Sequence, residues 1–188
     1  MIETVILALI FAKIKGYKLK PFFKSWTVYP ILIFEAMYLF FQINVFMGNY
    51  EFINFAPWFK EVYMYLFLIP IFWYKEYIPA LIGSVFIFVG TLLNHLVMSV
   101  NGGKMPVYPT LSYITGYIEP NTFSKINDIH MLGTANVKLK FLSDILDIGY
   151  SVLSVGDILV RVFVLIIIYT TVKKTNEEIS IKSDRIFI

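Results

Sequence analysis

The chain has 188 residues and no cysteine, which excludes disulfide bonds, cysteine nucleophiles and thiolate metal sites. Hydrophobic residues make up 58% of it and charged residues 15%, whereas soluble domains contain roughly 45–50% and about 25%. A soluble protein of this size could not bury so much apolar surface, and a net charge of +3 is too small to indicate nucleic-acid binding. The composition therefore predicts a single integral membrane domain over residues 1–188.

Long apolar segments predict an all-α membrane protein with about five transmembrane helices. The first segment, residues 2–14, lacks the basic region and cleavage site of a signal peptide, so we predict a retained helix. Pro70 is expected to kink the third segment. The other segments cover residues 26–47, 59–74, 77–98 and 157–172, and a mixed-charge tail follows from Lys173 to Ile188.

The distribution of Lys and Arg predicts the orientation, because cytoplasmic loops carry an excess of them. With five spans, one side holds ten of the 16 basic residues, the other side holds five, and Arg161 lies within a span. The side with ten is expected to be the cytoplasm, which places the N-terminus outside and the C-terminus inside. The ten residues are Lys13, Lys15, Lys18, Lys20, Lys24, Lys75, Lys173, Lys174, Lys182 and Arg185.

The long loop of residues 101–156 joins the fourth and fifth segments and keeps apolar residues throughout. Leu111, Ile114 and Ile118 have helical spacing, and residues 137–141 alternate like a short half-buried strand or an interfacial segment. This pattern favours a structured outward cap on the helix ends over the alternative, partial insertion into the headgroup layer.

Both ends of this loop contain signals that fix the chain. Asn101–Gly103 is typical of a helix end, where glycine supplies a left-handed residue. Ser154 can cap the fifth helix, with Asp157 as its reciprocal partner three residues on. We expect Asp157 to pair with Arg161 or with a backbone group of the loop. We also expect the stretches 105–107 and 141–144 to pack over the polar groups below.

The second segment carries Glu35, Tyr38 and Gln42 on one helical face. Glu35 lies about 13 Å from the inner edge, a depth at which a carboxylate must be protonated, paired or hydrated. Two interpretations stay open: a functional intramembrane group, or a neutral glutamic acid that hydrogen-bonds to a neighbouring helix. We expect Glu35 to pair with the fourth or fifth segment or to have a raised pKa.

Depth arithmetic places several polar residues in one layer beneath the outer surface. Gln42 and Asn94 lie about 24 Å from the inner edge, and Arg161 lies about 6 Å below the outer edge. His95 joins this layer, and Glu35 is about 10 Å deeper. If these faces converge, they line an outward-facing polar pocket under the loop.

Small and polar residues also follow one face of the fourth segment, where they predict close helix packing. They are Ala80, Gly83, Ser84, Gly90, Thr91 and Asn94.

Several stretches of the loop resemble an uncharacterised bacterial family of small membrane proteins, a domain of unknown function. The similar elements are Asn101–Val107 (NGGKMPV), His130, the stretch 139–145 (LKFLSDI) and the stretch 154–159 (SVGDIL). The family pattern has Lys where Ile129 stands and Gly where Ser143 stands. The resemblance implies the membrane architecture and the location of a site, and no activity.

Enzyme signatures such as Gly-x-Ser-x-Gly and His-Glu-x-x-His are absent from the sequence, and we expect no metal and no cofactor. We therefore predict a non-catalytic binding or accessory protein of the bacterial plasma membrane. Its partners would be the lipid bilayer and a membrane protein or small polar ligand. The ligand-binding candidates are Glu35, Gln42, Asn94, His95, Asn101, Met105, Pro106, His130, Asp144, Asp157 and Arg161.

Two alternative functions stay open. The first is a small proton-coupled transporter that uses Glu35, which requires a continuous polar path to both faces. The second is a membrane enzyme acting on lipid or peptide, with His130 and either Asp144 or Asp157 as acid–base groups in an open cleft.

The predicted topology can be tested with reporter fusions at the C-terminus and within residues 121–128. Because five spans place these points on opposite sides, the two fusions should report opposite compartments. Fusions that report the same compartment would show that the five-span topology is wrong.

Overall fold

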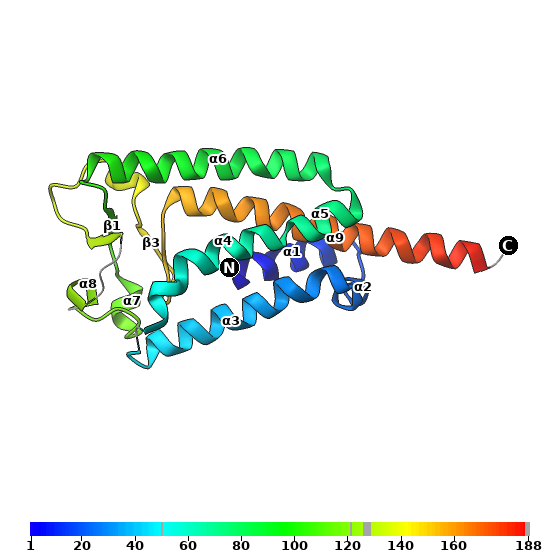
Figure 1. Ribbon diagram of the computed structural model, residues 1–188, viewed down its shortest axis with the longest axis horizontal. Helices are drawn as coiled ribbons and strands as arrows, with labels where there is room; N and C mark the ends of the chain where they lie inside the picture. The colour runs from blue at the N-terminus through cyan, green and yellow to red at the C-terminus, as the bar shows by residue number, and fades with distance from the viewer. Residues whose placement is uncertain (50, 121, 126–128, 187–188) are drawn as a thin grey trace. The chain divides into compact units, whose positions relative to one another are not determined.

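A computed structural model describes residues 1–49, 51–120, 122–125 and 129–186, and it is mainly helical (Figure 1). The chain divides into two compact units. The helical unit contains Met1–Phe40, Asn54–Val85 and Arg161–Ile188, and the cap unit contains Phe41–Ile53 and Phe86–Val160. Each unit is described separately below.

Among the described residues, the helical unit is built from seven helices and two short 3-10 helices, some of which continue into the cap unit. In chain order they are α1 (Ile2–Ile14), α2 (Lys20–Lys24), η1 (Trp26–Val28), α3 (Tyr29–Phe46), η2 (Glu51–Phe55), α4 (Ala56–Leu66), α5 (Leu68–Tyr74), α6 (Tyr77–Val100) and α9 (Val155–Ile186).

Three helices of the described chain are long and apolar enough to cross a membrane: Trp26–Phe46, Tyr77–Val100 and Val155–Ile181. They correspond to the second, fourth and fifth predicted segments. In α6, Ile78, Leu81 and Phe88 are each at least 70% exposed. Side chains of this kind are unfavourable in water and suit contact with lipid tails.

The other two predicted segments are also helical, but they are shorter than these three. α1 has 13 residues, and the third segment is divided into α4 and α5 at Phe67. Pro70 explains the break, because its ring clashes with the carbonyl group four residues earlier, at Leu66, where α4 ends.

The mixed-charge tail is not a separate segment, because α9 continues through it to Ile186. Lys174 donates a hydrogen bond to Glu177 at 2.8 Å, and Lys173 lies 3.9 Å from the same carboxylate. Pairs at these spacings stabilise a helix.

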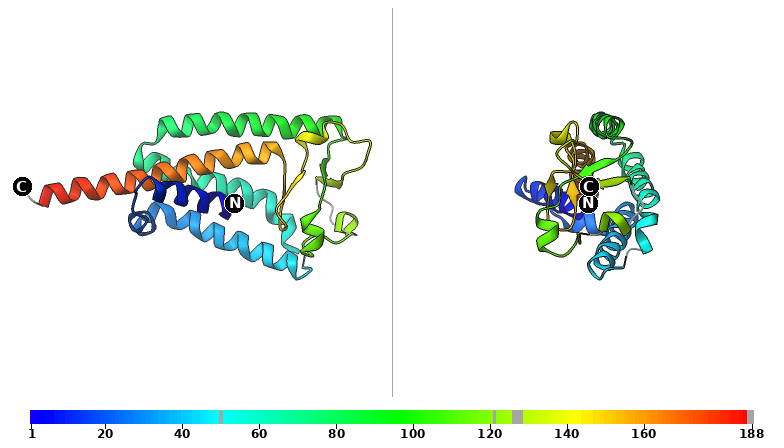
Figure 2. Two further views of the ribbon diagram at one scale, coloured as in Figure 1. Left: turned by 180° about the vertical axis from the view of Figure 1, so that it is seen from behind. Right: turned by 90° about the vertical axis from the view of Figure 1, so that its left-hand side faces the viewer.

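Contacts at both ends fix the direction of the helices in the helical unit. At the start of α1, Glu3 contacts Arg161. In the turn that follows α1, the backbone of Lys18 forms two 2.9 Å hydrogen bonds with the Asn176 side chain. α1 therefore runs parallel to α9, and the side views show the blue helix beside the orange part of α9 (Figures 1 and 2).

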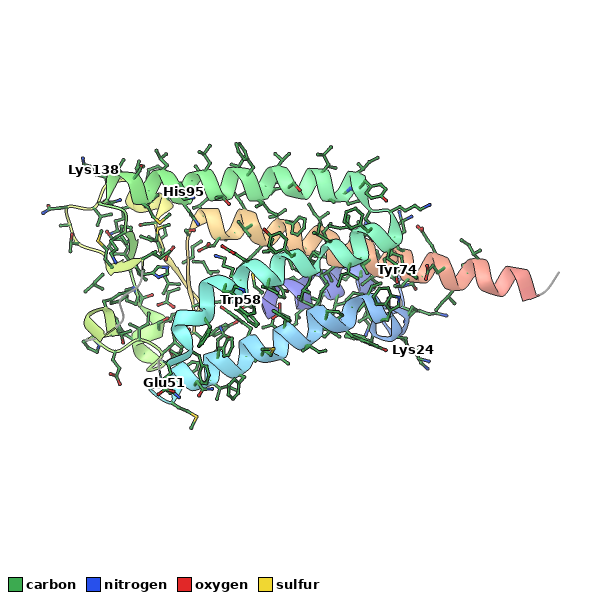
Figure 3. All side chains as sticks on the ribbon, in the orientation of Figure 1. Lys24, Glu51, Trp58, Tyr74, His95 and Lys138 are labelled. Carbon is green, nitrogen blue, oxygen red and sulfur yellow. The ribbon has the colours of Figure 1, made fainter. Side chains whose placement is uncertain are left out.

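α3 runs antiparallel to the α4–α5 pair. Near the start of α3, the Ser25 hydroxyl lies 2.7 Å from the Tyr74 hydroxyl, and the Trp26 ring packs edge to face on the Trp73 ring. Further along α3, Phe34 stacks on Phe59, which comes earlier in the chain than Trp73 and Tyr74. Figure 3 places Lys24 and Tyr74 at the same end of this unit. The most deeply buried apolar residues of the unit, each at most 1% exposed, include Phe22, Val28, Ile31, Phe67, Val164, Ile167, Ile168 and Val172.

The loop of residues 101–156 is folded into short elements. They are β1 (Met105–Val107), α7 (Leu111–Ile114), α8 (Thr122–Lys125), β2 (His130–Leu132), η3 (Lys140–Leu142), β3 (Leu146–Asp147) and β4 (Val152–Leu153). β1 pairs with β2 in parallel, and β3 pairs with β4 antiparallel.

One local prediction for the loop is wrong. Residues 137–141 do not form a strand, because Leu139 adopts a left-handed conformation with φ of 55° and the 3-10 helix η3 begins at Lys140. The predicted helix is present only as the four residues of α7.

Glycines bring α6 and α9 together in the cap unit. A Cβ added to Gly90 would lie 2.5 Å from the Gly156 carbonyl oxygen, so only glycine allows this approach. Thr91 and Ser84, which were predicted on the same face, are exposed instead. The face of α6 that packs closely is therefore narrower than predicted, because it does not include Ser84 and Thr91.

Replacing Gly90 with alanine should destabilise the protein by about 1–3 kcal/mol, because the new methyl group overlaps the backbone of α9. Thermal unfolding in detergent measures the effect. Thr91→Ala, on an exposed side chain of the same helix, is the matched control and should change stability by less than about 0.5 kcal/mol. Equal shifts for the two variants would contradict the glycine contact.

Candidate functional site

Glu35 lies in the core of the helical unit and is 4% exposed. The Tyr63 hydroxyl of α4 donates a 2.5 Å hydrogen bond to Glu35 Oε1. Glu35 Oε2 is buried and has no hydrogen-bond partner among the residues that the structure describes. The partner in this bond thus comes from the third predicted segment rather than from the fourth or fifth.

Arg161 binds Glu3 rather than standing unpaired in its helix. Its Nη1 donates a 2.9 Å hydrogen bond to Glu3 Oε2, and the amino group of Met1 lies 3.2 Å from the same oxygen. The Arg161 side chain is 13% exposed and that of Glu3 is 25% exposed. This pair joins α1 to α9 within the helical unit.

Asp157 contacts a backbone group of the loop, which was one of its two expected partners. Its Oδ2 accepts a 3.3 Å bond from the Ser154 N–H, and the Ser154 hydroxyl accepts a 2.9 Å bond from the Asp157 N–H. The predicted capping box is therefore confirmed.

Asn94 of α6 connects this cap to the neighbouring helix. Its side-chain amide donates a 3.2 Å bond to Asp157 Oδ1 and accepts a 2.8 Å bond from the Ser154 hydroxyl. Asn94 has a packing role here, since it joins the end of the loop to α6.

The loop segments around Met105–Val107 and Asp144 form one small sheet. Met105 pairs with His130 in register, and the backbone of Asp144 bonds to Pro106 and Tyr108 at 3.1 and 2.8 Å. Met105 and Pro106 are buried in this sheet, as structural positions.

The sheet brings His130 and Asp144 together, although they are 14 residues apart. His130 Nε2 lies 3.6 Å from Asp144 Oδ2. The Asp144 side chain is 4% exposed and the His130 side chain 39%. The buried carboxylate attracts the imidazole when His130 is protonated, and part of the imidazole side chain remains exposed.

Two further side chains hold the cap unit together. Asn101 donates a 2.9 Å bond to the Lys138 carbonyl and accepts a 3.0 Å bond from the Lys138 N–H. Asp147 accepts bonds from the Thr110, Ser112 and Gly149 N–H groups and from the Ser112 hydroxyl, all within 2.6–2.8 Å. Burial opposes the charged form of Asp147, but these bonds outweigh it and lower the pKa of the carboxyl group.

The remaining candidates have separate environments. Gln42 is 7% exposed, with its amide nitrogen buried and without a hydrogen-bond partner among the described residues. His95 is exposed on α6, where Figure 3 labels it. Gln42, Asn94 and His95 belong to the cap unit, whereas Glu35 and Arg161 belong to the helical unit. The shared polar pocket stays a prediction.

Sequence reasoning did not single out three residues of the helical unit: Glu3, Tyr63 and Glu76. A signal for Glu3 was present, because the intramembrane Arg161 requires a nearby carboxylate. Tyr63 gives no signal, because the chain contains 13 tyrosines. Glu76 lies just after the third predicted segment, where a charged residue is expected.

Glu76 is 2% exposed and lies between α5 and α6. Its Oε2 is 2.9 Å from the Thr170 hydroxyl and 3.4 Å from the Thr171 hydroxyl of α9. Burial raises the pKa of Glu76 to about 7, although the two threonine hydroxyls and Lys174 favour the charged form. The protonated carboxyl group can donate to Thr170, whose own hydrogen then remains for the carbonyl of Ile166 at 3.0 Å.

The three helices that are long and apolar enough to cross a membrane indicate an α-helical membrane protein. The chain belongs to a family of unknown function, DUF5317, whose model matches residues 19–169. This match agrees with the resemblance to an uncharacterised family. No curated protein and no solved structure shows significant similarity to the chain.

The Glu76 environment predicts how stability depends on pH. Since the pKa is raised on folding, its contribution is fully present below pH about 4.5 and is lost as the pH rises through about 7. Over this pH range, the free energy of unfolding should fall by about 3 kcal/mol because of Glu76. Melting of the detergent-solubilised protein measures it, and Glu76→Gln should flatten the curve in this range. Glu61→Gln, on an exposed side chain of α4, should keep the slope. An unchanged slope in Glu76→Gln would contradict the assignment.

Proposed function

We propose that this protein is a non-catalytic binding protein of the plasma membrane that recognises a small anionic group at its outward-facing cap. The proposal has two parts. The first is a topology of five membrane segments with the N-terminus outside. The second is a binding surface on the described residues of the stretch 101–156.

Two features of the helical unit support the topology. α1 runs parallel to α9, and α4–α5 runs antiparallel to α3, as five alternating segments require. All five lysines between residues 13 and 24 are exposed, and no acidic residue lies between Glu3 and Glu35. A basic cluster of this density is typical of the cytoplasmic side.

The distribution of charge in the cap carries the binding proposal. Asp144 is buried, and the carboxylate of Asp147 is occupied by backbone and hydroxyl donors. In contrast, His130 is partly exposed, and Lys138 and Lys140 are exposed. Asp147 therefore satisfies donors inside the cap, whereas the basic residues keep exposed surface. Lys140 Nζ also lies 4.4 Å from the centroid of the Tyr108 ring.

This arrangement favours an anion such as a phosphate group. Lysine side chains attract it as point charges, and a histidine beside a buried carboxylate can donate a hydrogen bond to it. Glu119, which is exposed in the same stretch, limits the positive surface. The phosphate could be free in solution or could belong to a lipid headgroup.

The His130–Asp144 contact also favours a second candidate, a membrane enzyme that uses this pair in acid–base chemistry on lipid or peptide. Turnover of such a substrate that disappears in His130→Gln would identify the enzyme. Binding without turnover would identify the binding protein.

The two histidines of the chain provide an internal comparison for a test by NMR. The full chain, with labelled histidine rings, is placed in nanodiscs of zwitterionic lipid and titrated with inorganic phosphate. A second sample contains phosphatidylglycerol. We expect the NMR signals of His130 to shift and those of His95 to remain unchanged. The variants His130→Gln and His95→Gln, each of which lacks one set of signals, assign the signals to the two residues. A response to added phosphate alone indicates a free anion, and a response to the anionic lipid indicates a headgroup.

Unchanged His130 signals with both phosphate and anionic lipid would contradict the proposed function. Equal shifts of His130 and His95 would also contradict it, because they would show a general effect of charge or ionic strength.

A further inference from the structure

We propose that Glu35 is a proton-binding site in the core of the helical unit, independent of the binding surface on the cap. The carboxylate has one oxygen bonded to Tyr63, and its second oxygen is buried without a hydrogen-bond partner among the described residues. Burying a charged carboxylate oxygen without a hydrogen-bond partner costs free energy. Binding a proton removes the charge and with it most of this cost.

The charged and titratable groups around Glu35 come from three helices. α1 contributes Glu3 and the amino group of Met1, α4 contributes Tyr63, and α9 contributes Arg161. Arg161 is hydrogen-bonded to Glu3 at 2.9 Å, so its charge is already balanced by another carboxylate. The Met1 amino group and Arg161 are positive and Glu3 is negative, so the net charge of this cluster is +1 when Glu35 is protonated and zero when Glu35 is ionised.

The geometry at the free oxygen favours a proton over a larger cation. Glu35 is 4% exposed, and the surface of its Oε2 is closed. A hard metal cation takes about six or more oxygen ligands, whereas this position offers a single oxygen. The described residues also contain no group of three or more His, Asp or Glu side chains that could hold a metal ion. The binding step forms one O–H bond at Glu35 and breaks no covalent bond of the protein.

Tyr63 makes the site reversible rather than permanently neutral. The Met1 amino group favours the ionised form, the Tyr63 hydroxyl stabilises it by donating a hydrogen bond to the carboxylate, and Arg161 also favours it. Burial favours the protonated form. These opposing contributions act on one carboxyl group, and such a group can bind and release a proton. A transporter that uses Glu35 would require such a site.

The carbonyl stretch of a protonated carboxylic acid provides a direct measurement by infrared spectroscopy. The full chain is studied in detergent in a Glu76→Gln, Asp144→Asn background, so that the two other buried carboxyl groups of the described residues do not contribute. We expect a band at pH about 5 that disappears reversibly, with one midpoint, before pH about 10. Glu35→Gln should remove this band, and Glu61→Gln, on an exposed side chain of α4, should retain it.

Tyr63→Phe separates a proton site from a structural hydrogen bond. Without the tyrosine donor, the ionised form loses its stabilisation, so proton affinity should rise about tenfold and the band should shift in frequency. Because this variant keeps the carboxyl group, it assigns the band even if Glu35→Gln fails to fold.

Two results would overturn the proposal. A Glu35 band that persists unchanged at pH about 10 would show a permanently neutral carboxylic acid. The absence of a Glu35 band at pH about 5 would show a permanently ionised carboxylate.

Discussion

The pairing of Arg161 with Glu3 is the interaction on which the helical unit depends. A guanidinium group inside an apolar helix is costly unless a carboxylate compensates it within the protein. Glu3 supplies that carboxylate from the first turn of α1, at 2.9 Å. The pair explains why a helix of only 13 residues has a defined place beside α9. It also sets the surroundings of Glu35, because Arg161 is already engaged with another carboxylate.

A different constraint organises the cap unit. There the backbones of α6 and α9 approach so closely that Gly90 and Gly156 leave no room for a side chain. Asn94 occupies the next turn and bonds to the capping residues Ser154 and Asp157. The start of α9 is thus fixed by three kinds of contact: close packing, the capping box and the asparagine amide. The small sheet of the cap then places His130 next to Asp144.

The sequence was most informative where a local rule determines structure. Apolar segment lengths predicted the helices, and the Ser154–Asp157 spacing predicted the cap of α9, because both depend on neighbours along the chain. The Pro70 kink followed from the same kind of rule. In contrast, the tail after Lys173 is helical because charged pairs along α9 support it, and the sequence reasoning weighed only its mixed charge.

Long-range partners could not be predicted in the same way. The bonds of Glu35 to Tyr63 and of Arg161 to Glu3 join residues that are 28 and 158 positions apart. Depth arithmetic gave the level of Glu35 and Arg161 in the membrane, but it carries no information on which helices are neighbours. The strand expected at residues 137–141 failed for a related reason: alternation cannot reveal the left-handed turn at Leu139.

A double-mutant cycle on Glu3 and Arg161 tests most directly whether an internal ion pair holds the helical unit together. Glu3→Gln and Arg161→Gln are made singly and together, and unfolding is measured in detergent. If the pair stabilises the fold, each single variant loses about 1–3 kcal/mol and the double variant loses clearly less than the sum. Additive losses would show that the two residues act independently, and would contradict this account of how α1 is held against α9.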